Sequence, residues 1–213
     1  KLKSGPLKRI ILSLGLTGVL LLAPGWSAAR HIIGGELTYR CLGYTDNDPA
    51  TNSRTYQVFM NIYLDCLGGG DTFDSAPGST VTASVTVYAA GTNVPVLVRY
   101  LPAPVATTVD PNPGNACVEV PSNVCIEQGV YEFPLLDLPI IDESYFIVYQ
   151  RCCRNETITN ISDPAVSGAT YFLEITPEAQ QTCNNSPVFN SFPPFVICAG
   201  EPLEIDLSAT DED

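Results

Sequence analysis

Residues 55–66 read TYQVFMNIYLDC, a stretch in which apolar and polar side chains alternate. Every second position is apolar or a cysteine: Tyr56, Val58, Met60, Ile62, Leu64 and Cys66. Because successive side chains of an extended strand point to opposite faces, this alternation predicts a strand with one buried face. Such a strand is stable only when a second layer covers its apolar side.

The same β-type pattern recurs along the chain. Alternation or an excess of β-branched and aromatic residues marks residues 35–41, 80–90, 94–101, 117–126, 130–136, 145–153 and 170–176. Clusters of Gly, Pro, Asn and Asp separate these stretches, and no stretch after residue 29 has helical periodicity. The sequence therefore predicts an all-β chain folded as an immunoglobulin-like, Greek-key β-sandwich.

The first 29 residues have the features of a signal peptide. Four basic residues precede or open an apolar run at residues 10–23, which Pro24 and Gly25 end. Small residues Ser27 and Ala29 follow, so we expect cleavage after Ala29 and secretion to the cell surface. The apolar run is shorter than the roughly 20 residues that a membrane-spanning helix needs, so we expect no stable membrane insertion.

The predicted mature chain is strongly acidic. The full sequence carries 10 basic and 23 acidic residues, and residues 1–29 hold four of the basic ones. The remainder therefore has a net charge of −17 and no lysine. Such a surface repels phosphate groups, which argues against nucleic acid as a partner.

Eight cysteines in a secreted chain predict a disulfide framework. They are Cys41, Cys66, Cys117, Cys125, Cys152, Cys153, Cys183 and Cys198. A turn between Cys117 and Cys125 favours a local bridge between those two.

The adjacent Cys152 and Cys153 point to opposite faces of a strand, so we expect two separate partners for them. Cys183 is the candidate for one, and Cys41 or Cys66 for the other. Cys198 is expected to pair outside this chain. Zinc binding is disfavoured, because the chain has no CxxC motif and one histidine.

Two units follow the signal peptide. Residues 30–182 are long enough to form the sandwich and bury a core. Residues 183–213 begin with an Asn/Pro-rich linker and continue with two apolar stretches, 194–198 and 203–207, before an acidic end. We expect the first two strands of a second, truncated sandwich there, and therefore a longer protein.

Four segments carry a family resemblance: HIIGGELTYRCLG, IYLDCLGGGDTFD, VYQRCCRNETITNI and NSPVFNSFPPFVICAGEPLEIDLSATDED. In this order they resemble the N-terminal region of large secreted surface proteins of Bacteroidota, many of which end in gliding-motility-associated or type IX secretion sorting domains. The last segment also resembles the start of a cadherin-like or polycystic-kidney-disease-like module. The resemblance implies a multi-domain surface protein whose partners include its own downstream domains.

Catalysis is not expected. Residues 30–36 are similar to the activated N-terminus of chymotrypsin-like proteases, but the sole histidine, His31, precedes that start and no GDSGG motif follows. A glycoside hydrolase that uses two carboxyl groups stays open as a third alternative.

Calcium is the one candidate cofactor. Asp211 and Asp213, with Glu201 or Asp206, would supply oxygen ligands at a junction between modules. Looser candidates are residues 45–48, Asp71 and Asp74.

The sequence favours a non-enzymatic adhesin or display domain. It would present the loops at residues 42–54 and 67–79 to an extracellular protein or glycan. The alternative is a carbohydrate-binding module, for which the loop aromatics Tyr44 and Phe73 are the candidate sugar platforms.

Overall fold

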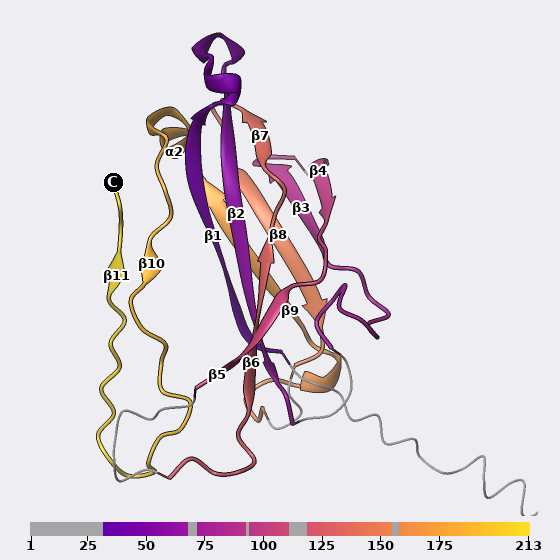
Figure 1. Cartoon of the computed structure of the whole chain (residues 1–213), viewed down its shortest axis with the longest axis vertical. Helices are drawn as coiled ribbons and strands as arrows, with labels where there is room; N and C mark the ends of the chain where they lie inside the picture. Colours follow the sequence, from indigo (N-terminus) through magenta and orange to yellow (C-terminus); the bar gives the residue numbers. More distant parts are fainter. Residues whose placement is uncertain (1–31, 68–71, 93, 111–118, 155–157) are drawn as a thin grey trace, which may run out of the picture.

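The computed structural model describes residues 32–67, 72–92, 94–110, 119–154 and 158–213 (Figure 1). The predicted signal peptide, His31, Asp71 and Cys117 lie outside these residues. Two antiparallel sheets pack around one apolar core, so the prediction of an all-β sandwich is confirmed. The immunoglobulin-like Greek-key connectivity stays a prediction, and so does the division into two domains.

The first sheet has five strands. Its order is β1 (Ile32–Tyr44), β2 (Ser53–Asp65), β6 (Ile126–Glu132) and β5 (Val105–Val109), with β7 (Leu136–Pro139) also paired to β2. The second sheet has the order β4 (Pro95–Tyr100), β3 (Ser84–Ala89), β8 (Tyr145–Cys152) and β9 (Gly168–Ile175). The loops within the described ranges contain three short 3₁₀ helices: η1 (Thr45–Asn47), η2 (Pro49–Thr51) and η3 (Pro164–Val166).

Residues 55–66 lie almost entirely in β2, a strand with one buried face, as predicted. The inward side chains of β2 are fully buried: Tyr56, Val58, Met60, Ile62 and Leu64. They lie in one cluster with Ile147 and Tyr149 of the opposite sheet. Burying each large apolar side chain contributes about 1.5–3 kcal/mol, so this strand is a main source of stability.

One short helix was not predicted. α2 (Pro177–Thr182) begins after Thr176, whose Oγ1 accepts a hydrogen bond from the Ala179 N–H at 3.1 Å. It ends at Cys183, which has a left-handed backbone conformation. Six residues are too few to show helical periodicity, but the Thr-Pro start is a recognisable N-terminal signal.

Buried polar contacts attach α2 to the sandwich. The fully buried Gln180 donates to the Glu143 carbonyl at 2.8 Å and accepts from the Ile141 N–H at 3.0 Å. Arg54 on β2 donates to the carbonyls of Gln180 and Gln181, at 3.0 and 2.7 Å. A cation at the C-terminal end of a helix satisfies carbonyls that have no partner within the helix.

The disulfide pairing differs from the prediction. Cys41 on β1 bonds to Cys183 at the end of α2, and Cys66 after β2 bonds to Cys125 before β6. The predicted bridge from Cys117 to Cys125 is therefore wrong. That prediction relied on the local turn, whereas the antiparallel pairing of β2 with β6 brings Cys66 next to Cys125.

The adjacent cysteines also pair differently, because Cys152 and Cys153 bond to each other. The expectation of two separate partners assumed that both residues lie in a strand. β8 ends at Cys152, and Cys153 has a φ of +99°, so the chain leaves the strand between them. Cys198 is exposed and has no disulfide partner among the described residues.

The connection from β2 to β3 inserts two side chains into the sandwich. The Phe73 ring lies directly over Gly129 of β6, where a Cβ atom would come within 2.6 Å of the ring. Asp74 is 2% exposed and lies 3.1 Å from the guanidinium of Arg151 on β8. The hydroxyl of Tyr149 donates to the second oxygen of Asp74 at 2.7 Å. A buried carboxylate with both a cation and a hydroxyl donor is a well-compensated charge.

The segment after α2 contains two short strands, β10 (Val188–Phe189) and β11 (Ala209–Thr210), which pair with each other. The predicted strands at 194–198 and 203–207 are not formed. An apolar stretch forms a strand only where a neighbouring strand supplies hydrogen bonds, and neither stretch has such a neighbour among the described residues. Figure 1 shows this segment running beside β1.

Candidate functional site

The outer face of the five-stranded sheet carries a row of polar and aromatic side chains. The outward positions of β2 include Phe59, Asn61 and Tyr63. Pairing with β1 places Glu36 opposite Asn61 and Thr38 opposite Phe59. The alternation that buries one face of β2 therefore also sets the composition of this outer face.

The C-terminal segment is hydrogen-bonded to the free edge of β1. The N–H of Ser186 donates to the Tyr39 carbonyl at 3.0 Å, and the N–H of Tyr39 donates to Ser186 Oγ at 2.8 Å. The N–H of Cys41 donates to Asn185 Oδ1 at 3.0 Å. These contacts cover backbone groups that an exposed edge strand would otherwise present. Tyr39 is buried beneath them, and burial together with Asp213 and Asp211 raises its pKa to about 12.

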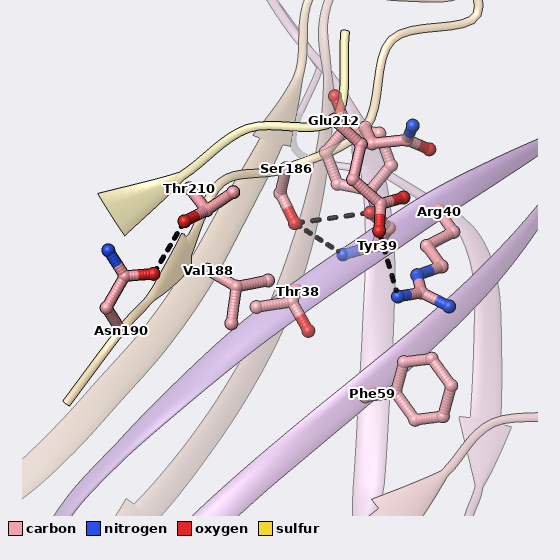
Figure 2. A pocket seen from close by; sticks show the side chains of 10 residues that line it. Thr38, Tyr39, Arg40, Phe59, Ser186, Val188, Asn190, Thr210 and Glu212 are labelled. Atoms are coloured by element: carbon pink, nitrogen blue, oxygen red, sulfur yellow. Dashed lines mark hydrogen bonds and ion pairs between the residues drawn. The ribbon is translucent and has the colours of Figure 1, made fainter. Parts of the chain in front are cut away.

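A first pocket, the Arg40 pocket, lies between β1 and this segment and has a volume of about 450 Å³. Figure 2 shows Arg40 paired with Glu212 on one side of the view and Asn190 hydrogen-bonded to Thr210 on the other, with Ser186 between them. The Arg40 and Glu212 charges are 3.5 Å apart, and their side chains are 60% and 64% exposed. Solvent screens such a pair, so it contributes little to holding the segment in place.

A second pocket, the Glu36 pocket, adjoins the first and has a volume of about 460 Å³. Val188 and Asn190 line both pockets. One wall is the outer sheet face, and the other is formed by residues 188–193 with Leu207. The site is therefore composite, since it needs both the sandwich and the segment that follows it.

Four polar side chains of the Glu36 pocket form one hydrogen-bonded chain. Asn61 Nδ2 donates to Glu36 Oε1 at 2.9 Å, and the Tyr63 hydroxyl donates to the same oxygen at 3.3 Å. Gln128 Nε2 donates to the Tyr63 hydroxyl at 3.4 Å. Burial and, next, the Glu36 carboxylate raise the pKa of Tyr63, so its hydroxyl keeps its proton and acts as a donor.

An aromatic contact closes one end of the Glu36 pocket. The rings of Tyr63 and Phe192 meet edge to face, with centroids 5.7 Å apart, and Phe195 lies 6.3 Å beyond Phe192. Phe192 nevertheless remains 52% exposed. The pocket thus combines hydrogen-bonding groups on one wall with an accessible aromatic surface on the other. Sequence reasoning missed it, because the residues of the two walls are at least 60 positions apart in the chain.

The predicted calcium ligands are not brought together. The described part of the chain contains no group of three or more His, Cys, Asp or Glu residues placed to hold a metal ion. Asp213 accepts hydrogen bonds from Asn184 and Asn185, while the Asp206 carboxylate accepts one from the Ser208 N–H. That bond lowers the pKa of Asp206. Glu201 and Asp211 are exposed.

The loops proposed as presenting surfaces differ in accessibility. Within residues 42–54, Tyr44 is covered on one side by Arg54, whose guanidinium carbon lies 3.8 Å from the ring centroid. Within residues 67–79, Phe73 is buried, so its prediction as a sugar platform is wrong. Asp74 is buried and paired with Arg151, which rules it out as an accessible calcium ligand. Buried roles for Phe73 and Asp74 have no local signal in the sequence.

None of the helices in the described ranges is long and apolar enough to cross a membrane. Comparison of the chain with protein-family models, curated proteins and solved structures finds no match.

Proposed function

We propose that this chain is a non-enzymatic module of an extracellular surface protein, and that it serves in adhesion or display. The observation that carries the proposal is the fixed exit of the chain from the sandwich. The Cys41–Cys183 bond anchors the end of α2 to β1, and residues 185 and 186 continue along the β1 edge through hydrogen bonds. Because a disulfide fixes the point where the chain leaves the sandwich, a domain attached there would be held in a defined direction. A display protein requires such a fixed direction.

Disulfide bonding supports a location outside the cell. Three disulfides connect the described residues, and such bonds persist in oxidising compartments. The basic and apolar start of the chain supports export, and the resemblance to secreted surface proteins of Bacteroidota supports attachment within a longer protein. Downstream domains of the same chain are accordingly its first partners.

A carbohydrate-binding module is the second candidate, and the Glu36 pocket favours it. The Glu36 pocket does not support the alternative of a glycoside hydrolase. Retaining and inverting glycosidases both use two carboxyl groups on either side of the scissile bond. Among the described residues that line this pocket, Glu36 is the one with a carboxyl group.

Adhesion can be tested with beads that carry the purified chain. We expect such beads to attach to surfaces coated with extracellular polysaccharide or matrix protein more strongly than beads carrying albumin. Beads with the reduced and alkylated chain are the matched control, because loss of the disulfides removes the fixed geometry without changing the sequence. Equal attachment of all three kinds of bead would contradict the proposed function.

A further inference from the structure

The Glu36 pocket contains side-chain oxygens that accept no hydrogen bond from the described residues. Glu36 uses Oε1 for both of its hydrogen bonds, and no described residue donates to its Oε2. Asn61 and Gln128 donate through their amide nitrogens, and their side-chain carbonyl oxygens likewise receive no hydrogen bond from the described residues. Three oxygens on one wall can therefore accept hydrogen bonds from a ligand that is rich in donors.

The opposite wall offers apolar contact. Phe192 keeps about half of its surface exposed while its ring meets Tyr63, and Val188 and Leu207 extend the apolar area. A ligand that suits both walls needs hydroxyl donors on its rim and an apolar C–H face for an aromatic ring. Concave sites with apolar lining and a few fixed polar groups are the usual form of small-ligand sites.

We propose that the Glu36 pocket binds a neutral saccharide, with Phe192 against a sugar-ring face and Glu36, Asn61 and Gln128 as acceptors for its hydroxyl groups. We expect the saccharide to be neutral because the negative charge of the chain repels acidic sugars. Glu36 is an acidic residue, and the predicted mature chain carries a net charge of −17, so uronic acids and sialic acids are repelled. The saccharide site rests on the proposed adhesive function and names the ligand class that such adhesion would use.

The test uses the purified chain on an array of neutral and uronic-acid oligosaccharides, followed by calorimetric titration of the strongest neutral ligand. We expect neutral sugars to bind and uronic acids not to bind. Phe192→Ala should weaken the binding at least about tenfold, because the aromatic contact is lost. The matched control is Phe172→Ala on β9 of the other sheet, where the ring is 62% exposed; affinity there should be unchanged.

Glu36→Gln tests the charge argument separately. This variant keeps the shape of the side chain and an acceptor oxygen but removes the negative charge, so we expect uronic-acid oligosaccharides to gain binding. Thermal unfolding of each variant checks that the sandwich is intact. Phe192 is half-exposed and lies outside the core cluster, so its removal should leave the melting temperature of the sandwich unchanged.

Three results would overturn the saccharide site. One is an array without hits, and another is a neutral hit whose affinity is the same in wild type and Phe192→Ala. The third is selective binding of lysine-rich peptides instead of sugars, which would mean that the oxygens of Glu36, Asn61 and Gln128 bind cations. Beads that attach to matrix protein while the array stays empty would overturn the saccharide site and leave the adhesive function standing.

Discussion

The guanidinium of Arg151 and the carboxylate of Asp74 form an ion pair 3.1 Å apart, and their side chains are 9% and 2% exposed. The pair joins the loop after β2 to β8 and thus connects the two sheets. Tyr149 also donates to Asp74, and burial followed by the Asp74 charge raises the pKa of Tyr149. The tyrosine therefore stays protonated and keeps this hydrogen bond at physiological pH.

Replacing Asp74 by Asn should be strongly destabilising, because it leaves the Arg151 charge buried without its counter-charge. We expect the free energy of unfolding, measured by denaturant titration, to fall by about 3–5 kcal/mol. Arg40→Ala is the control, since it breaks an exposed pair and should cost at most about 1 kcal/mol. Equal losses of unfolding free energy in the two variants would show that the buried pair stabilises the fold no more than the exposed pair does.

Gly129→Ala should also destabilise the sandwich. The added Cβ would meet three carbons of the Phe73 ring at 2.6 to 3.0 Å, so the ring or β6 must move. Overpacking of this kind costs about 1–3 kcal/mol. Gly34→Ala provides the comparison, because its Cβ would have no neighbour within 4 Å. If denaturant midpoints of the two variants coincide, Phe73 does not pack on β6 as described.

The disulfides should differ in their effect on stability. Cys41 and Cys183 are 142 residues apart, so their bond restricts a long stretch of the unfolded chain. Replacing both by Ala should lower the free energy of unfolding by about 2–4 kcal/mol. Replacing both Cys152 and Cys153 by Ala should cost less, since a bond between neighbours restricts almost no chain.

Peptide mapping without reduction checks the pairing that underlies this comparison. It should recover Cys41 with Cys183, Cys66 with Cys125, and Cys152 with Cys153 in a single peptide. A peptide that links Cys117 to Cys125 would contradict the structure.

The individual strands could be predicted from the sequence, because local patterns of side chains indicate them. β2, β4, β8 and β9 lie within or close to the stretches expected from alternation and β-branched residues, because side-chain period determines which face of a strand is buried. Pairing between distant residues has no such local signal. The Cys66–Cys125 bond, the Asp74–Arg151 pair and the Glu36 pocket all depend on which strands become neighbours.

The two cysteines at the end of β8 show a second limit. Alternation indicates where a strand runs but not at which residue it stops. A strand that is longer by one residue, to Cys153, would place the two thiols on opposite faces, which is why the pattern does not predict the bond between them. In residues 194–207 the apolar stretches led to the wrong prediction of two strands, because no neighbouring strand among the described residues pairs with them.

Stability should fall in alkaline solution partly through Tyr39. Its pKa is raised to about 12 in the folded chain from an ordinary value of 10, so the folded state holds the proton more tightly than the unfolded state. The resulting stabilisation is complete below pH 10 and is lost as pH rises through 12. The slope for one such group is at most about 1.4 kcal/mol per pH unit.

Tyr39→Phe removes this titration while keeping the buried ring. We expect the free energy of unfolding of the variant, measured between pH 9 and 11, to decline less steeply than that of wild type. If the free energies of unfolding of wild type and variant decline with the same slope, burial of Tyr39 at the β1 edge, beneath the C-terminal segment, does not raise its pKa.

The proposed function requires that the folded chain itself mediates attachment at the cell surface. The most direct measurement is the attachment of cells of the producing organism to a surface in the presence of increasing amounts of the purified chain. A competing module should reduce attachment in a dose-dependent way, and the reduced and alkylated chain should not. Attachment that is unchanged at saturating amounts of the folded chain would contradict the account.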